Sequence, residues 1–488
     1  MSEYKELNRN YEKLIKNYQS IRKKLEETEE LKKQLEEKIN LIEGEKKDLE
    51  QKNNKLNELN LTLSKKKDLN KETKKKLEEI TLELSKSNKN FIESKEELQK
   101  VIKEKEDLKT LNIELKKQLS KKIMDSTRKN YIIAKFEIKK SDIKQETQIL
   151  NYNENDKSEE LKNSCEIYIK DKKIPFSYTY KFEKEGIYTI KYQFNKKIKN
   201  GSFMFHFCEK LTEIDLSNFD SSEITNMTAM FNTCTSLKTI NLEFLQTNKV
   251  TDITVMFENC KSLEYLDFSN FNSSNIKSMG GLFSECSSLI SLDLSHFNTS
   301  NVKDMTCLFS GCSSLKSLNI QNFNTSNVEE MSAMFQSCSS LLFIDLSSFN
   351  TKNVKNMNYM FSECKSLKFL DLSNFETPNL VNMDCMFQFC KNLKYIDLKN
   401  FNTSQVTSMG SCFRDCYSLK SLDLSSFDTK KVEKMEYMFY KCESLLMLDL
   451  SNFNTALIDD VNNIFLNFNS DCKVTTSDYR INNVLFLN

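Results

Sequence analysis

The chain has 488 residues, with 71 Lys and Arg against 70 Asp and Glu, two His, no Trp, seven Gly, two Pro and 15 Cys. So few Gly and Pro favour long helices or uniform repeats over a loop-rich enzyme, and a net charge of +1 does not indicate a nucleic-acid-binding protein. No stretch approaches the roughly 20 apolar residues of a membrane span, and the first twenty residues lack the pattern of a secretory signal, so we expect a soluble, cytoplasmic chain without a membrane span.

The N-terminal segment shows a repeat of seven residues that runs from Leu7 to Leu119. Thirteen of its seventeen positions are apolar. A sustained seven-residue repeat in a highly charged segment without Pro is typical of a coiled coil, so we predict one over residues 1–125. Polar residues such as Lys32 and Asn53 at the companion core position favour two strands, and therefore a homodimer. The alternative is a charged single helix or a partly disordered tail.

The segment 126–200 changes to an alternating pattern of apolar and polar residues. The alternation predicts β-strands, and it is visible in the runs 131–138, 165–169, 175–182 and 186–194. Such a short segment buries little surface by itself. We therefore expect a small all-β unit that caps the first of the repeats that follow.

Cysteines recur every 26 residues in the C-terminal half of the chain, and a Phe precedes each of them by three positions. The repeating cysteines are Cys208, Cys234, Cys260, Cys286, Cys312, Cys338, Cys364, Cys390, Cys416 and Cys442. A fixed period of this length with an L-x-x-L-x-L pattern predicts a solenoid, because one repeat cannot bury its apolar face alone. We expect about ten turns over 201–466 and a C-terminal cap over 467–488.

Each repeat divides into two halves with different spacing. Leu292 and Leu294 alternate with polar residues, as in a strand, whereas Met305, Phe309 and Cys312 have the spacing of one face of a short helix. The predicted fold class is therefore an α/β leucine-rich repeat solenoid with a strand and a short helix in each 26-residue turn. A small all-β unit and a long α-helical coiled coil precede it.

The repeat consensus L-x-x-L-D-L-S-x-F-N-T-S-N-V-x-x-M-x-x-M-F-x-x-C resembles that of the BspA-type leucine-rich repeat family, described as surface proteins of bacteria and anaerobic protists. The resemblance covers about 201–466. It implies a binding or adhesion role without catalysis, in some bacterial members toward host matrix proteins. The long N-terminal coil and the missing signal pattern depart from the secreted members.

One column of equivalent positions, just before the second Leu of each repeat, contains several aromatic residues. The column reads Glu213, Thr239, Tyr265, Ser291, Ser317, Phe343, Phe369, Tyr395, Ser421 and Met447. We name Tyr265, Phe343, Phe369 and Tyr395 as candidate partner-binding residues, because neighbouring exposed aromatics concentrate interface energy. The alternative is a structural role, in which these rings pack on one another or under the middle β unit.

A second column, two positions further along, consists of Asp and Asn. It reads Asp215, Asn241, Asp267, Asp293, Asn319, Asp345, Asp371, Asp397, Asp423 and Asp449. Like charges about 5 Å apart repel, so hydrogen bonds or the nearby lysines must compensate them. We expect a structural role for most of the column and include Asp345, Asp371 and Asp397 among the candidate partner-binding residues. A surface that binds cations or a basic partner is the alternative.

No motif for catalysis, a metal or a cofactor emerges from the sequence. The repeating cysteines lie among apolar residues, where a thiol behaves as a small apolar group, and neither a C-x-x-C motif nor a Cys/His cluster is present. We therefore predict no catalytic residues, no metal and no cofactor.

The sequence predicts a non-enzymatic interaction or scaffold protein, dimerised by 1–125, which binds a protein partner through the solenoid sheet. The alternatives are a surface adhesin and a structural filament protein.

Overall fold

The computed structural model describes residues 130–151 and 159–487. The chain divides into two units at Arg128, and the description that follows concerns the second, Lys129–Asn488. The coiled coil predicted for 1–125 lies outside the described residues. The part of the chain that is described contains no long coiled coil.

An antiparallel group of strands precedes the repeats. Its elements are β1 (Tyr131–Ile138), the 3-10 helix η1 (Lys140–Asp142), β2 (Glu146–Gln148), α3 (Glu160–Ser164), β3 (Cys165–Ile169), β4 (Lys172–Ile174), β5 (Thr179–Lys181) and β6 (Gly186–Phe194). β1 alternates inward and outward side chains and pairs antiparallel with both β6 and β7 (Leu211–Asp215), the first strand of the repeats. The sheet order β4-β3-β6-β1-β7-β8 therefore joins this group directly to the repeats.

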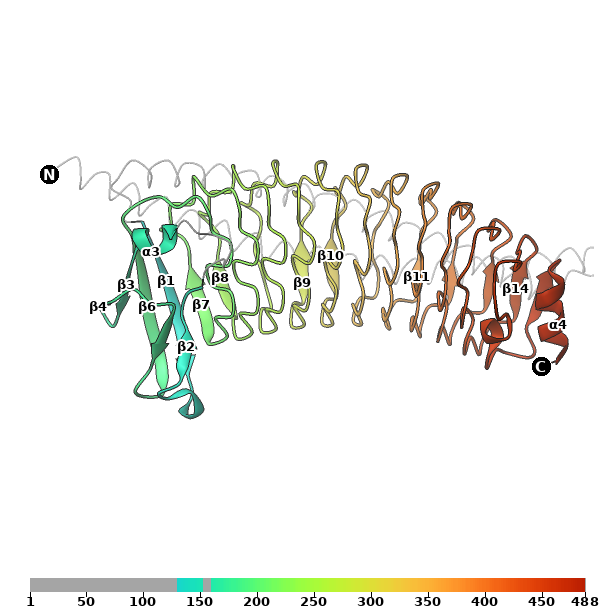
Figure 1. Cartoon of the computed structure of the whole chain (residues 1–488), viewed down its shortest axis with the longest axis horizontal. Helices are drawn as coiled ribbons and strands as arrows, with labels where there is room; N and C mark the ends of the chain where they lie inside the picture. The colour runs from blue at the N-terminus through green and yellow to red at the C-terminus, as the bar shows by residue number, and fades with distance from the viewer. Residues whose placement is uncertain (1–129, 152–158, 488) are drawn as a thin grey trace, which may run out of the picture. The chain divides into compact units, whose positions relative to one another are not determined.

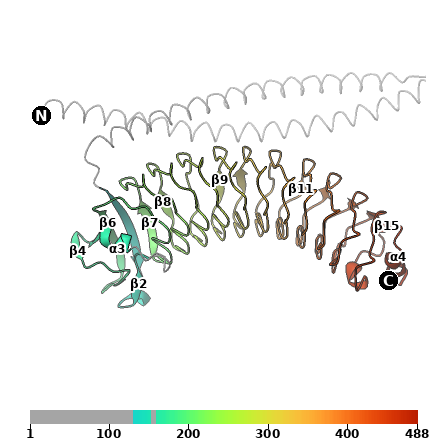
Figure 2. The same cartoon turned by 45° about the horizontal axis from the view of Figure 1, so that its top comes forward.

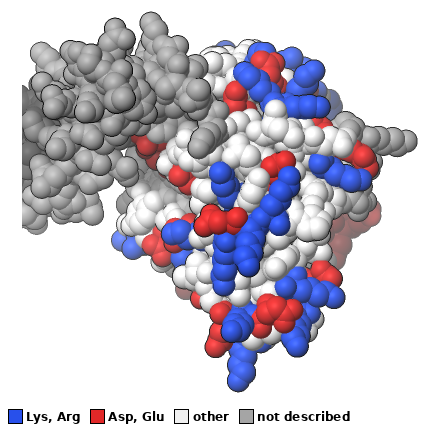
Figure 3. All heavy atoms as spheres, turned by 90° about the vertical axis from the view of Figure 1, so that its left-hand side faces the viewer, with Lys and Arg blue, Asp and Glu red and all other residues white. Residues whose placement is uncertain are grey.

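The free edge of this sheet is the short strand β4, which contributes two lysines. Lys173 forms an ion pair of 2.7 Å with Glu166 on the neighbouring strand β3. Figure 3 views this end of the unit and shows a band of Lys and Arg side chains with Asp and Glu beside them. A short, charged edge strand disfavours pairing with a further strand, so the sheet ends here.

The repeats form a parallel β-solenoid of about 10 turns, each called a coil here. Its strands are β7, β8 (Thr239–Asn241), β9 (Ser291–Asp293), β10 (Ser317–Asn319), β11 (Phe369–Leu370), β12 (Tyr395–Ile396), β13 (Ser421–Asp423) and β14 (Met447–Leu450). Paired residues are 26 positions apart, as in Ser291 and Ser317. Isolated parallel bridges such as Asp304 to Glu330 link the coils on another side. Figures 1 and 2 show the coils following one another in a curved row.

The prediction of a short helix in each repeat is wrong. In the segment from Met305 to Cys312, the N–H of Phe309 donates to the carbonyl of Met334 in the next coil at 2.9 Å. The N–H of Cys312 donates to the carbonyl of Phe309, only three residues earlier, at 3.1 Å. Cys307 and Gly311 have positive φ values of 54° and 73°, which no α-helix contains. Consecutive tight turns therefore produce the spacing of three and four residues, and the fold is a β-solenoid rather than a strand-and-helix solenoid.

Asp and Asn side chains shape three corners of a coil. In one coil the carboxylate of Asp293 accepts from the N–H of Ser295 at 3.0 Å, the amide oxygen of Asn298 from Ser300 at 3.0 Å, and Asp304 from Thr306 at 2.8 Å. A side chain that accepts from the backbone two residues on stabilises a turn without Gly or Pro. This explains how the chain turns so often with only seven Gly and two Pro.

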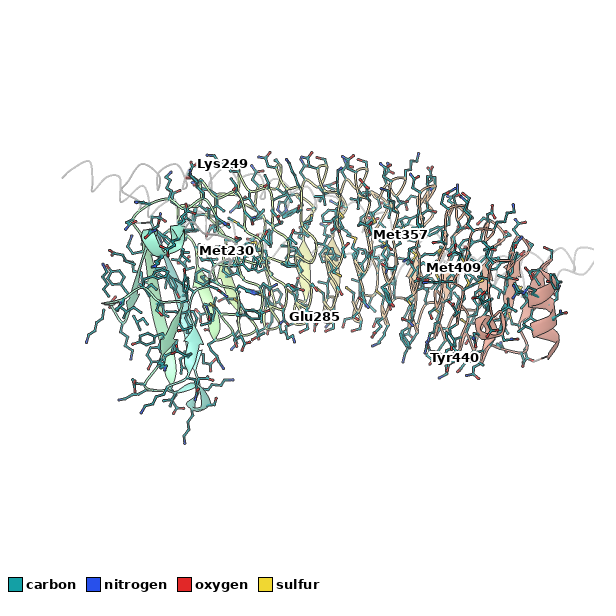
Figure 4. The ribbon with its side chains drawn as sticks, viewed as in Figure 1. Met230, Lys249, Glu285, Met357, Met409 and Tyr440 are labelled. Atoms are coloured by element: carbon teal, nitrogen blue, oxygen red, sulfur yellow. The ribbon has the colours of Figure 1, made fainter. Side chains whose placement is uncertain are left out.

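The interior of the coils consists of stacked columns of apolar side chains. Phe rings from Phe205 to Phe465 stack in one column, with neighbouring ring centres 5.5 to 6.2 Å apart. Figure 4 shows Met230, Met357 and Met409 inside the coils, and all three are fully buried. Lys249, Glu285 and Tyr440 lie at the periphery in the same view. Burial of these columns between neighbouring coils drives the stacking.

The C-terminal end closes with η2 (Asn462–Phe465), β15 (Lys473–Thr476) and α4 (Tyr479–Leu487). β15 pairs parallel with β14. The carboxylate of Asp478 accepts from the N–H of Thr455 at 2.7 Å and from its hydroxyl at 2.9 Å. It thereby takes the place of the backbone that a further coil would supply. Within the described ranges no helix is both long and apolar enough to cross a membrane.

Candidate functional site

Where a coil contains a strand, the strand fixes which side chains face outward. In β11 and β12 the second residue points inward, so Leu370 and Ile396 are buried, while Phe369 and Tyr395 are paired in register and point outward. The period of two in a strand places the Asp two positions later on the same outward face. The fold therefore presents the aromatic column and the Asp column side by side.

The structure exposes all four aromatic candidates. The exposed fractions are 60% for Tyr265, 68% for Phe343, 60% for Phe369 and 53% for Tyr395. Phe343, Phe369 and Tyr395 occupy three consecutive coils and form a contiguous surface, called the aromatic strip below. Tyr265 lies three coils before Phe343, which at about 4.8 Å per coil separates it by roughly 14 Å.

Three further exposed apolar residues were not named as candidates in the sequence analysis. Leu342 and Leu446 replace Lys in the column just before the aromatic one, and Met447 follows in the aromatic column after Ser421. Each is more than half exposed. The sequence could have revealed the two leucines as unusual, because five other repeats have Lys at the same position.

The Asp column has a structural role. The carboxylates of Asp345, Asp371 and Asp397 accept from backbone N–H groups two residues on, at 3.0, 2.9 and 3.1 Å. These hydrogen bonds lower the pKa of Asp345 and Asp371 below the ordinary value. Asn319 makes the same type of turn, so the turn itself does not need a charge. Among the described residues, no group of three or more His, Cys, Asp or Glu side chains is arranged to hold a metal ion.

The repeating cysteines are free thiols buried in the interior. Each thiol from Cys234 onward donates to the Phe carbonyl of the preceding coil, as Cys338 does to Phe309 at 3.2 Å. Burial raises the pKa of Cys338 and of Cys390 to about 12. The thiols therefore serve as inter-coil hydrogen-bond donors, a role that their spacing alone did not indicate.

A second surface group, also missed by the sequence analysis, surrounds Arg414. Its guanidinium lies 4.8 Å from the ring centre of Tyr440 and 5.6 Å from that of Tyr437. Its Nε pairs at 3.2 Å with the buried carboxylate of Asp415, which also accepts from the hydroxyl of Tyr417 at 2.7 Å. That hydrogen bond raises the pKa of Tyr417 to about 12. Because Arg414 is held by rings and by a carboxylate, this group stabilises a corner of the coil.

Comparison with protein families gives matches across the repeats. The family described as "Mycoplasma protein of unknown function, DUF285" matches residues 176–291, 251–370, 277–395 and 361–478, which together cover more than half of the chain. The chain belongs to the DUF285 family. The aromatic strip lies inside the DUF285 matches, and residues before 176 lie outside them. No curated protein matches the chain.

Proposed function

We propose that this DUF285 protein is a non-enzymatic interaction protein that binds a protein partner through the aromatic strip. The observation that carries the proposal is the exposure of Phe343, Phe369 and Tyr395 on three consecutive coils, while the residue that follows each of them is buried. Contiguous exposed aromatics are rare on surfaces that bind nothing, and buried aromatic anchors supply much of the energy of protein interfaces.

The resemblance of the repeat consensus to BspA-type proteins supports binding rather than catalysis. The exposed Leu342 supports it as well, because it adds apolar surface beside Phe343 in the same coil. We further propose that residues 1–125 dimerise the chain, on the basis of the seven-residue repeat.

We propose a reducing, cytoplasmic location. All 15 cysteines are free thiols, and such a content of unpaired cysteine is typical of proteins that do not meet an oxidising compartment. A surface location would expose the partly accessible Cys307 and Cys472 to oxidation.

The test is site-specific photo-cross-linking in the native cell. A benzophenone side chain replaces Phe343, Phe369 or Tyr395 in separate variants, and Tyr479, which is exposed outside the strip, serves as the matched control. We expect a protein adduct of one defined mass from the strip positions and none from position 479. Absence of adducts at all three strip positions, or equal adducts at position 479, would contradict the proposal.

A further inference from the structure

We propose that the aromatic strip binds the same strip of a second copy of this chain, about a two-fold axis parallel to the row of coils. This inference rests on the proposed function and names the partner.

Two rows of opposite charge border the strip. Lys368, Lys394 and Lys420 precede the strands, and Asp371, Asp397 and Asp423 follow at their carboxyl ends. The three lysines are exposed. Within a coil, the Lys and the Asp are three residues apart, which is about 10 Å along an extended chain. The Lys is exposed just before the strand begins, and the inward position of the strand is the Leu or Ile that precedes the Asp. Lys365 and Lys399 form ion pairs, whereas none of the ion pairs between described residues involves Lys368, Lys394 or Lys420.

This order of charges is self-complementary in only one orientation. A two-fold axis along the row of coils keeps the order of the coils and reverses the strand direction of the second copy. The Lys row of one copy then lies over the Asp row of the other. An axis along the strands would place Lys over Lys and Asp over Asp, which is repulsive. Most soluble homodimers have such a two-fold interface with one self-complementary patch.

The position of the axis also suits the aromatic rings. The midpoint between the Lys row and the Asp row lies about half a residue beyond the aromatic column. The two strips are therefore offset by one residue, or about 3.3 Å, rather than directly superposed. Offset contacts are the favoured arrangement of aromatic rings.

Asp397 also pairs with Lys399 of its own chain at 3.1 Å, so the pairs of Lys368 with Asp371 and of Lys420 with Asp423 contribute most.

The test uses cysteine variants of the full chain and a bis-maleimide whose arm matches the about 10 Å separation of face-packed sheets. Phe343→Cys and Tyr395→Cys are two coils apart, and each faces its own counterpart in the proposed pair. Tyr479→Cys and the unmodified chain are controls, the latter for the partly exposed Cys307 and Cys472. We expect both strip variants to give covalent dimers and both controls to remain unlinked.

The charge rows are tested in the Tyr395→Cys background. Replacing Lys368, Lys394 and Lys420 together by Glu should lower the yield of dimer about tenfold, since the three attractive pairs on each side of the two-fold axis become repulsive. Lys316→Glu is the matched control and should leave the yield unchanged, because Asn319 occupies the Asp position of its coil.

Three results would overturn the inference. The first is full reaction of the introduced thiols of both strip variants without dimers. The second is linkage of position 343 only to position 395 in a mixture of the two variants, and the third is an equal effect of the triple Glu variant and Lys316→Glu. If the photo-cross-linker captures a different protein while no dimers form, the proposed function stands and this inference fails. If neither experiment yields an adduct, both fail.

Discussion

At the scale of single residues, a column of buried Ser and Thr hydroxyls connects each coil to the next. The hydroxyl of Thr325 donates to the carbonyl of Asn350 at 2.9 Å and accepts from its N–H at 2.8 Å. Ser273 occupies the equivalent position and accepts from Asn298 at 2.8 Å. The column thus satisfies backbone groups that the corner leaves outside the parallel bridges.

Thr325→Val should lower the free energy of unfolding by about 1–3 kcal/mol, because it leaves a backbone donor and acceptor without a partner. Thr325→Ser keeps the hydroxyl and should remain closer to the wild type. Urea unfolding of both variants checks this. Equal stability of the Val and Ser variants would show that the hydrogen bonds contribute nothing.

The repeating thiols should resist alkylation in the native protein. Burial raises the pKa of Cys286 and Cys442 to about 12, whereas an exposed thiol ionises near pH 8.5. Since the thiolate forms only in the unfolded chain, stability is fully present below the ordinary pKa and falls as the pH rises toward about 12. Mass spectrometry after native alkylation at pH 8 should find label mainly on Cys307 and Cys472. Full labelling of the column without denaturant would contradict burial.

At the scale of elements, the sequence predicted the period and the buried columns but not the path of the backbone. Met305, Phe309 and Cys312 are buried as expected, yet their N–H groups do not make the hydrogen bonds of a helix. The spacing of inward side chains is the same for a helix and for consecutive tight turns. What distinguishes them is left-handed backbone at Ala229, Val255 and Tyr359, residue types that give no sequence signal for it.

The candidate surface, too, could be predicted from the sequence only in part. The aromatic residues could be predicted, because equivalent positions in a repeat must face the same way. The Asp column could be only partly interpreted, since its turn role depends on backbone N–H positions that follow from the fold. Leu342 and Leu446 were missed because their column was treated as a row of lysines.

Asp478 should hold the C-terminal end of the solenoid in place. Its carboxylate also accepts from the N–H groups of Arg480 at 2.9 Å and Ile481 at 3.2 Å. Asp478→Ala should destabilise β15 and α4 by about 1–2 kcal/mol, as loss of a helix cap does. Hydrogen exchange should quicken there and remain unchanged in β9. Unchanged exchange in β15 and α4 would show that Asp478 is not needed for closure.

At the scale of the whole molecule, the seven-residue repeat predicts a dimer through 1–125. Light scattering of the full chain at micromolar concentration should give twice the chain mass. A truncated form, 126–488, should associate more weakly and depend on concentration. Monomers from both forms would remove the basis for dimerisation.

The central claim is that Phe343, Phe369 and Tyr395 serve binding rather than folding. The most direct measurement is partner binding by a variant with all three replaced by Ser, the residue present at positions 291, 317 and 421. Because exposed substitutions usually change stability by about 0.5 kcal/mol or less, its melting temperature should stay close to that of the wild type. We predict that the folded variant fails to bind the partner identified by photo-cross-linking. A variant that folds and binds as well as the wild type, or one that does not fold, would contradict the claim.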